Sequence, residues 1–137
     1  MSETMGAPGR TERAMCQKHV EQLLSTAPGV IGVLVCSIDG FEVASRLRPP
    51  LTAERLSAMT SSQLALCEAL CGETGVGPCR NVVIEAEAGR LLMLSVPAQR
   101  RRMLLTVLCE HDSVLGSVLW AARSCAQDIG RRLDDRL

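Results

Sequence analysis

The sequence predicts an α+β domain in which helices and antiparallel strand pairs follow one another along the chain. Apolar residues recur with helical spacing in three stretches: residues 11–27, 52–71 and 112–129. Extended apolar runs pair across two short turns, Asp39-Gly40 and Ala88-Gly89, as hairpins do. The predicted order is therefore helix, two strands, helix, three strands, helix, with no repeat and no linker that would divide the chain.

Length and composition fit one domain with an ordinary core and exclude several classes of function. The chain has 137 residues, 47% of them hydrophobic, which is enough for a core without disulfides or metal. The charges of its 15 basic and 15 acidic side chains cancel, so the chain has no net charge that would attract nucleic acid or anionic lipid. Tyrosine is absent, and one phenylalanine and one tryptophan provide no stacking platform for single strands. We expect neither a nucleic-acid nor a membrane partner.

The amino-terminal residues and the cysteines predict a cytoplasmic protein. MSETMGAPGR contains no apolar signal segment, and no apolar run is long enough to cross a bilayer. The seven cysteines are an odd number. Five of them lie within apolar patterns, as buried reduced thiols do: Cys16, Cys36, Cys67, Cys109 and Cys125. We expect residues 1–10 to be disordered, residues 11–129 to form the domain, and residues 130–137 to be a charged tail.

The first predicted helix and the strands follow from local patterns. Residues 11–27 have one apolar side and end before Pro28-Gly29. The strands are predicted at residues 30–37, 41–47, 80–88, 90–96 and 102–110. The last two strands are apolar at both alternating sets of positions, which is typical of strands covered on both faces. Helices are therefore expected on both sides of the sheet.

The central predicted helix, residues 52–71, has two different faces. Thr52 is expected to cap its first turn, and the glycines of residues 72–78 end it. Its predicted core face consists of Leu56, Met59, Leu66, Cys67 and Leu70, with Gln63 among them. The opposite face carries small, uncharged residues: Ser57, Ala58, Ser61, Ser62, Ala65 and Ala69. Small residues allow another backbone to approach closely, so we interpret this face as a contact surface; the alternative is a tolerant exterior.

The last predicted helix begins after a cap at Asp112 or Ser113 and ends near Gly130. Its predicted buried stripe consists of Leu115, Val118, Leu119, Ala122, Cys125, Ala126 and Ile129.

With these elements in order, the chain resembles the roadblock/LC7 domain family, which includes dynein light chains and bacterial partners of small Ras-like GTPases. The resemblance covers residues 11–129 and is carried by two hairpins, PGVIGVLVCSIDGFEVAS and VVIEAEAGRLLMLSVP, and by the helix between them. It implies a five-stranded antiparallel sheet, with the first and last helices on one face and the central helix on the other.

The resemblance also implies a function. Family members dimerise through the central helix and an edge strand, which correspond here to residues 52–71 and 80–88. The expected contact residues therefore include Val82 and Ile84 in addition to the small-residue face. A noncatalytic homodimeric scaffold that binds, and regulates, a small Ras-like GTPase is the function that the resemblance implies.

Other chemistry is weakly represented in the sequence. Three cysteines with C-x3-C-x7-C spacing, Cys67, Cys71 and Cys79, would need Cys109 or His111 to complete a zinc site. The run of residues 100–102, three arginines, suits a phosphate or an acidic partner, although such runs are usually solvated. Neither a nucleophile motif nor a P-loop is present, so we expect no enzyme activity and no cofactor. The alternative function is a small-molecule, redox or metal sensor that uses the cysteines.

Overall fold

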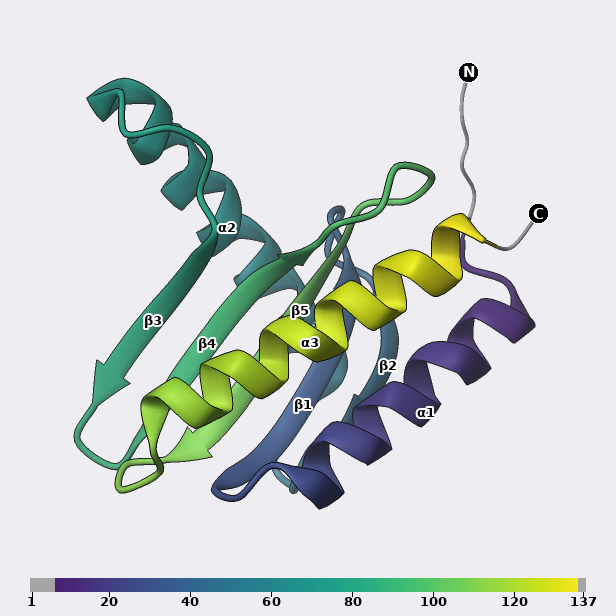
Figure 1. The fold of residues 1–137 in the computed structure, drawn as a ribbon, viewed down its shortest axis with the longest axis horizontal. Coiled ribbons are helices and arrows are strands. Elements are labelled where there is room, and N and C mark those ends of the chain that lie inside the picture. The colour runs from purple at the N-terminus through teal and green to yellow at the C-terminus, as the bar shows by residue number, and fades with distance from the viewer. Residues whose placement is uncertain (1–6, 136–137) are drawn as a thin grey trace.

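The chain folds as three helices and a five-stranded antiparallel sheet in a computed structural model that describes residues 7–135 (Figure 1). In chain order the elements are α1 (Arg10–Thr26), β1 (Val30–Ser37), β2 (Glu42–Arg46), α2 (Ala53–Thr74), β3 (Asn81–Ala86), β4 (Gly89–Val96), β5 (Met103–Glu110) and α3 (Leu115–Asp134). The strands lie in the order β2-β1-β5-β4-β3. The predicted fold class and element order are confirmed.

The helices cover the two faces of the sheet unequally. α1 and α3 lie side by side on one face, and α2 lies on the other (Figure 1). The three central strands, β1, β5 and β4, are sandwiched, as predicted for β4 and β5: Leu34, Leu92, Met93 and Leu105 are each at most 1% exposed. The main core lies between the sheet and the α1/α3 layer. The core under α2 is much smaller, consisting of Cys36, Leu64, Met93 and Leu104.

The predicted core face of α2 is wrong, because the helix packs on the sheet through a different face, with two small polar residues and one leucine. Its buried residues are Ser57, Thr60 and Leu64. The predicted core residues Met59, Leu66 and Leu70 are 58%, 59% and 58% exposed, and Leu56 and Cys67 are only partly buried.

The reason for this orientation is a close approach between α2 and the turn that joins β1 to β2. A β-carbon at Gly40 would lie 3.3 Å from the Cα atom of Ala58, and Gly40 has a φ of +94°. Ser61 Oγ donates a hydrogen bond to the carbonyl oxygen of Ile38 at 3.0 Å. Large side chains would not fit at this contact, so the small residues turn inward and the large apolar residues turn outward.

The helix ends differ from the predictions in several places. Thr52 is the N-cap of α2, but its side chain makes no capping hydrogen bond. The N-cap of α3 is Val114, one residue after the predicted Ser113. α3 also continues through Gly130 to Asp134, and Leu133 is fully buried, so the residues predicted as a charged tail begin inside this helix. Residues 1–6 of the predicted disordered segment lie outside the described residues, and α1 begins at Arg10.

Within residues 7–135, none of the three helices has the length and apolar content needed to cross a bilayer.

Candidate functional site

A surface formed by α2 and β3 exposes an unusual amount of apolar side chain. Five of the ten large hydrophobic residues that are exposed in the described chain come from α2, from the connector after it or from the side of β3 that faces α2: Met59, Leu66, Leu70, Val76 and Ile84. We define the α2–β3 surface as Ala58, Met59, Ser62, Ala65, Leu66, Ala69 and Leu70 of α2 together with Val82 and Ile84 of β3. Exposed apolar patches of this kind mark interaction sites on proteins.

The two elements contribute to the same side of the sheet. Val82 pairs with Met93, and Ile84 pairs with Leu91, in the β3–β4 ladder. Met93 belongs to the small core under α2, and Val82 and Leu91 pack against that core. Because paired residues share a face, Val82 and Ile84 point to the side that α2 occupies. Figure 1 shows that the carboxyl-terminal half of α2 extends beyond the strands and that its connector returns directly to β3.

β3 is the last strand of the sheet on this side, so its outer backbone edge has no neighbouring strand within the described chain. Its first four residues, 81–84, carry no charge, and β3 contains no proline. Natural edge strands are normally blunted by charge, proline or a bulge, because an open apolar edge pairs with other strands. β3 pairs with β4 in continuous register without a bulge. This edge is therefore suited to pairing.

The surface of α2 is apolar and low in relief. A shallow depression there is lined by Ala58, Met59, Ser62, Gln63 and Leu66. No Lys, Arg, Asp or Glu lies among residues 56–67, so the middle of the helix carries no formal charge. Such a surface can bury area against a partner without desolvating charge.

The predicted contact residues divide into an exposed group and an inward group. Ala58, Ser62, Ala65 and Ala69 are exposed, and Ile84 is 43% exposed. Val82 is half-buried. Ser57, in contrast, is fully buried, and Ser61 is half-buried through its bond to Ile38. Ser57 and Ser61 thus pack within the chain and do not belong to the α2–β3 surface.

Sequence reasoning missed Met59, Leu66 and Leu70 as surface residues. They repeat at intervals of seven and four, as the residues of a buried helical stripe do, so periodicity assigned them to the core. The available signal was the second stripe of Ser57, Thr60 and Leu64, which has the same helical spacing. Two stripes on one helix indicate two contacts, one inside the chain and one outside it.

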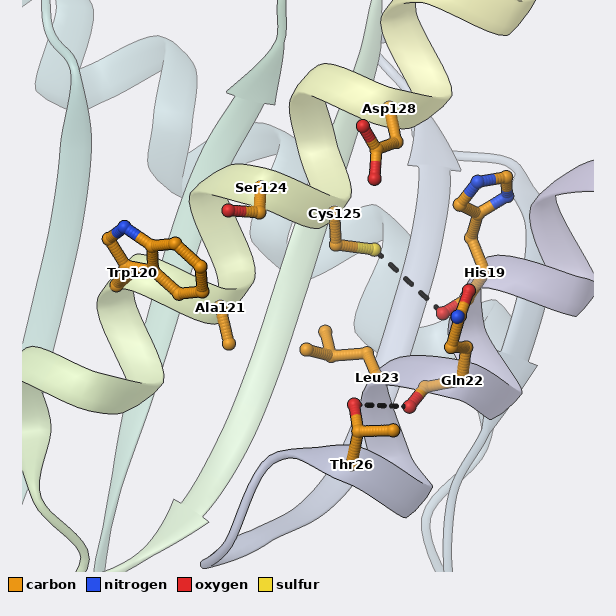
Figure 2. Close-up of a pocket in the computed structure, with 9 residues that line it drawn as sticks. All are labelled: His19, Gln22, Leu23, Thr26, Trp120, Ala121, Ser124, Cys125 and Asp128. Carbon is orange, nitrogen blue, oxygen red and sulfur yellow. Dashed lines mark hydrogen bonds between the residues drawn. The ribbon is translucent and has the colours of Figure 1, made fainter.

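A second hollow, of about 170 Å³, lies between α1 and α3 (Figure 2). It brings Cys125 near His19, but Cys125 Sγ donates to the backbone carbonyl of His19 at 3.8 Å, as Figure 2 shows. His19 Nδ1 lies 3.0 Å from the carbonyl oxygen of Met15. Burial raises the pKa of the Cys125 thiol to about 12. A thiol that stays protonated is a poor nucleophile, so this arrangement is structural.

The cysteines are all free thiols. Cys16, Cys36, Cys109 and Cys125 are buried as predicted, whereas Cys67 is partly exposed together with Cys71 and Cys79. Burial, and then a hydrogen bond with Cys71, raises the pKa of Cys79. Among residues 7–135, no group of three His, Cys, Asp or Glu side chains has an arrangement that could hold a metal ion.

Comparison with known proteins identifies the family of this chain. An uncharacterized protein of Methanocaldococcus jannaschii, MJ0310, is 34% identical over 106 residues, which are 77% of this chain and 90% of that protein. Myxococcus xanthus MglB superposes with a TM-score of 0.85 at 16% identity over 96% of this chain and 97% of MglB. A structure of MglB in a tetrameric arrangement gives a TM-score of 0.81 at 18% identity and covers both chains completely. The model of the Roadblock/LC7 domain matches residues 17–108, and the chain belongs to the Roadblock/LC7 family.

Proposed function

We propose that this protein is a noncatalytic scaffold that forms a homodimer through the α2–β3 surface and binds a small Ras-like GTPase. The observation that carries the proposal is the exposed apolar stripe of α2 beside the open edge of β3. Membership of the Roadblock/LC7 family supports it, because that family includes partners of such GTPases.

A second copy of the chain is the occupant that best suits this surface. An open edge strand and an apolar helix stripe on the same side are self-complementary under a two-fold axis. Two β3 strands can then pair through their backbones while two α2 helices pack together. Leu66 and Leu70 would become buried, and burial of each side chain is favourable by about 1.5–3 kcal/mol. The tetrameric arrangement of MglB shows that a protein of the same fold assembles with itself.

The GTPase is expected to contact the paired α2 helices. The side chains of Ala58, Ser62 and Ala65 are short and project little from the middle of the helix, so the backbone of a partner can approach α2 closely. The absence of charge between residues 56 and 67 means that contact costs little desolvation. The scaffold acts by holding the GTPase; we assign no residue of this chain to nucleotide hydrolysis.

Replacement of Ala58 and Ala65 together with arginine tests the proposal. Both residues are exposed, so the larger side chains do not enter the core. Two arginines without acidic partners in an apolar contact cost several kcal/mol per buried charge, as an order-of-magnitude estimate. Light scattering should show a dimer for the parent and a monomer for the variant. Pull-down with the small Ras-like GTPases of the source organism, loaded with GDP or a GTP analogue, should recover a GTPase only with the parent.

The matched control places two arginines on the opposite layer of the molecule. Ala14 of α1 and Gln127 of α3 are exposed, and the Ala14→Arg/Gln127→Arg variant makes the same charge change. It should remain dimeric and retain the GTPase. A folded Ala58→Arg/Ala65→Arg variant that still dimerises and binds the GTPase contradicts the assignment of this surface.

A further inference from the structure

At one end of the sheet, three segments that are distant in sequence enclose a cavity of about 620 Å³. The segments are the start of α1 with the residues before it, the turn between β1 and β2, and the loop between β4 and β5, which Figure 1 shows at the same end of the sheet. The turn and the loop are tied together by a hydrogen bond from the Ile38 amide to the Arg102 carbonyl oxygen at 3.2 Å. The volume lies within the range of small-molecule sites, which is about 300–1,000 Å³.

The charged lining of this cavity is dominated by arginine. Four arginines and a single aspartate contribute to it: Arg13, Arg100, Arg101, Arg102 and Asp39. The chain as a whole has no net charge, so this concentration is local. Guanidinium groups bind carboxylate and phosphate through two parallel hydrogen bonds, which makes the cavity suited to an anion.

Two of these arginines, Arg13 and Arg100, are held in place by hydrogen bonds to backbone carbonyl oxygens, which do not neutralise their charge. Arg13 Nη1 donates to the carbonyl oxygens of Glu42 at 3.2 Å and Val43 at 3.3 Å. Arg100 Nη1 donates to the carbonyl oxygen of Leu133 at 3.4 Å. Carbonyl oxygens are neutral acceptors, so both side chains are oriented while their positive charge remains. This preorganisation lowers the entropic cost of binding an anion.

The side chains of the other two arginines form ion pairs with acidic side chains. Arg101 Nε lies 3.4 Å from Glu12 Oε1, and Arg102 Nη2 lies 3.7 Å from Glu68 Oε2. The Arg101 and Glu12 side chains are 19% and 11% exposed, so this pair is largely buried. The Arg102 side chain is 63% exposed.

Apolar residues complete the cavity. Pro8, Ile38 and Phe41 line it, and Phe41 is 68% exposed although it is the single phenylalanine of the chain. A ligand that consists of a charged head and an apolar body matches this combination of arginines and hydrophobic side chains. Inorganic anions match the arginines alone.

We propose that this cavity is a binding site for a small amphiphilic anion, with a carboxylate or phosphate head against the arginines and an apolar body against Ile38 and Phe41. The site uses none of the residues of the α2–β3 surface. It therefore goes beyond the proposed scaffold function, and its test needs no GTPase.

Amide chemical shifts in NMR spectra provide the measurement. The uniformly labelled protein is titrated with octanoate and, separately, with octyl phosphate, below the concentrations at which either forms micelles. We expect saturable shifts at residues 37–41 and 97–102, and the tighter of the two ligands identifies the head group. Acetate and inorganic phosphate should bind at least about tenfold more weakly, because they lack the apolar body that would be buried against Ile38 and Phe41.

Two variants and one control locate the site. Arg100→Gln/Arg102→Gln should weaken binding at least about tenfold, since both charged hydrogen-bond donors to the head group are lost. Phe41→Ser should weaken octanoate binding more than acetate binding. Arg131→Gln/Arg132→Gln removes the same charge from two exposed residues of α3 outside the cavity and should bind like the parent.

The proposal is overturned if neither amphiphile shifts residues 37–41 and 97–102, or if the shifts centre on α2 and β3. The proposal is also overturned if Arg100→Gln/Arg102→Gln and Arg131→Gln/Arg132→Gln weaken ligand binding equally. That result would mean that binding depends on the overall charge of the protein and not on a defined site. Thermal melting of each variant shows whether the fold is intact. Should Arg100→Gln/Arg102→Gln fail to fold, Phe41→Ser decides the question alone, since Phe41 lies outside the core.

Discussion

Gly130 of α3 lies against Pro97 so closely that a β-carbon at Gly130 would be 2.4 Å from the Pro97 carbonyl oxygen. No real β-carbon makes so short a contact with backbone, so α3 crosses the end of β4 only because residue 130 has no side chain. Leu133, one turn later, is fully buried as a result. The glycine is a packing residue within the helix.

Gly130→Ala should therefore lower the free energy of unfolding by about 1–3 kcal/mol, which is the usual cost of forcing extra volume into a packed site. Gly116 provides the matched control, because it also lies in α3 and a β-carbon there meets nothing within 4 Å. Gly116→Ala should leave stability unchanged or raise it by up to about 1 kcal/mol. Urea denaturation followed by circular dichroism measures both. Equal stability of the two variants would show that α3 can move away from Pro97.

The central strands carry the second prediction. Leu92, Leu94 and Leu105 are at most 3% exposed, and all three belong to the core beneath α1 and α3. Truncation of any one of them to alanine should cost about 2–5 kcal/mol, as the sum of lost transfer energy and a cavity. Leu51→Ala, at a leucine that is 41% exposed, should cost much less. If the three core variants unfold like the parent in urea, the burial of these strands beneath α1 and α3 is incorrect.

The open edge of β3 leads to a third prediction. Ile84→Lys places a charge within the uncharged part of β3, residues 81–84, at a residue that is 43% exposed. Because a charged edge disfavours strand pairing, the variant should associate at least about tenfold more weakly while the monomer stays folded. Sedimentation equilibrium measures the association constant, and Ile84→Val should behave like the parent. If Ile84→Lys dimerises like the parent, β3 is not part of the dimer interface, and α2 alone forms it.

Alkaline pH provides the fourth prediction. Burial, reinforced by Glu12, raises the pKa of the Cys16 thiol from 9.0 to about 12, and burial raises the pKa of the Cys125 thiol from 9.0 to about 12. Between pH 9 and 12 the unfolded chain therefore binds fewer protons at these thiols than the folded chain does. The free energy of unfolding should then fall as pH rises, by at most about 1.4 kcal/mol per pH unit for each thiol.

Urea denaturation between pH 7 and pH 11 checks this slope. Cys16→Ala/Cys125→Ala should be less stable at neutral pH because of lost packing, but its stability should decline less steeply above pH 9. Cys67→Ala, at a partly exposed thiol of α2, should retain the steep decline of the parent. Identical slopes in the parent and the double variant would mean that the two buried thiols do not contribute to alkaline unfolding.

The sequence by itself determined the elements and their order. Helical and alternating periodicity located the three helices and five strands, and turns such as Asp39-Gly40 made the strand pairs antiparallel. Two strands, including the one that contains Leu105, are apolar at both alternating sets of positions, and this pattern indicated a sheet covered on both faces. These features depend on residues close together in the chain, so a linear pattern contains them.

Tertiary structure decided which stripe of α2 faces inward and where α3 ends. Both outcomes depend on contacts between distant backbones: Gly40 with α2, and Pro97 with Gly130. Where two chain segments approach this closely, small residues are the ones that fit, and size then outweighs hydrophobicity. The arginine cavity likewise exists only because the fold brings the start of α1 and two distant loops to one end of the sheet, where Arg13 and Arg100 line the same cavity.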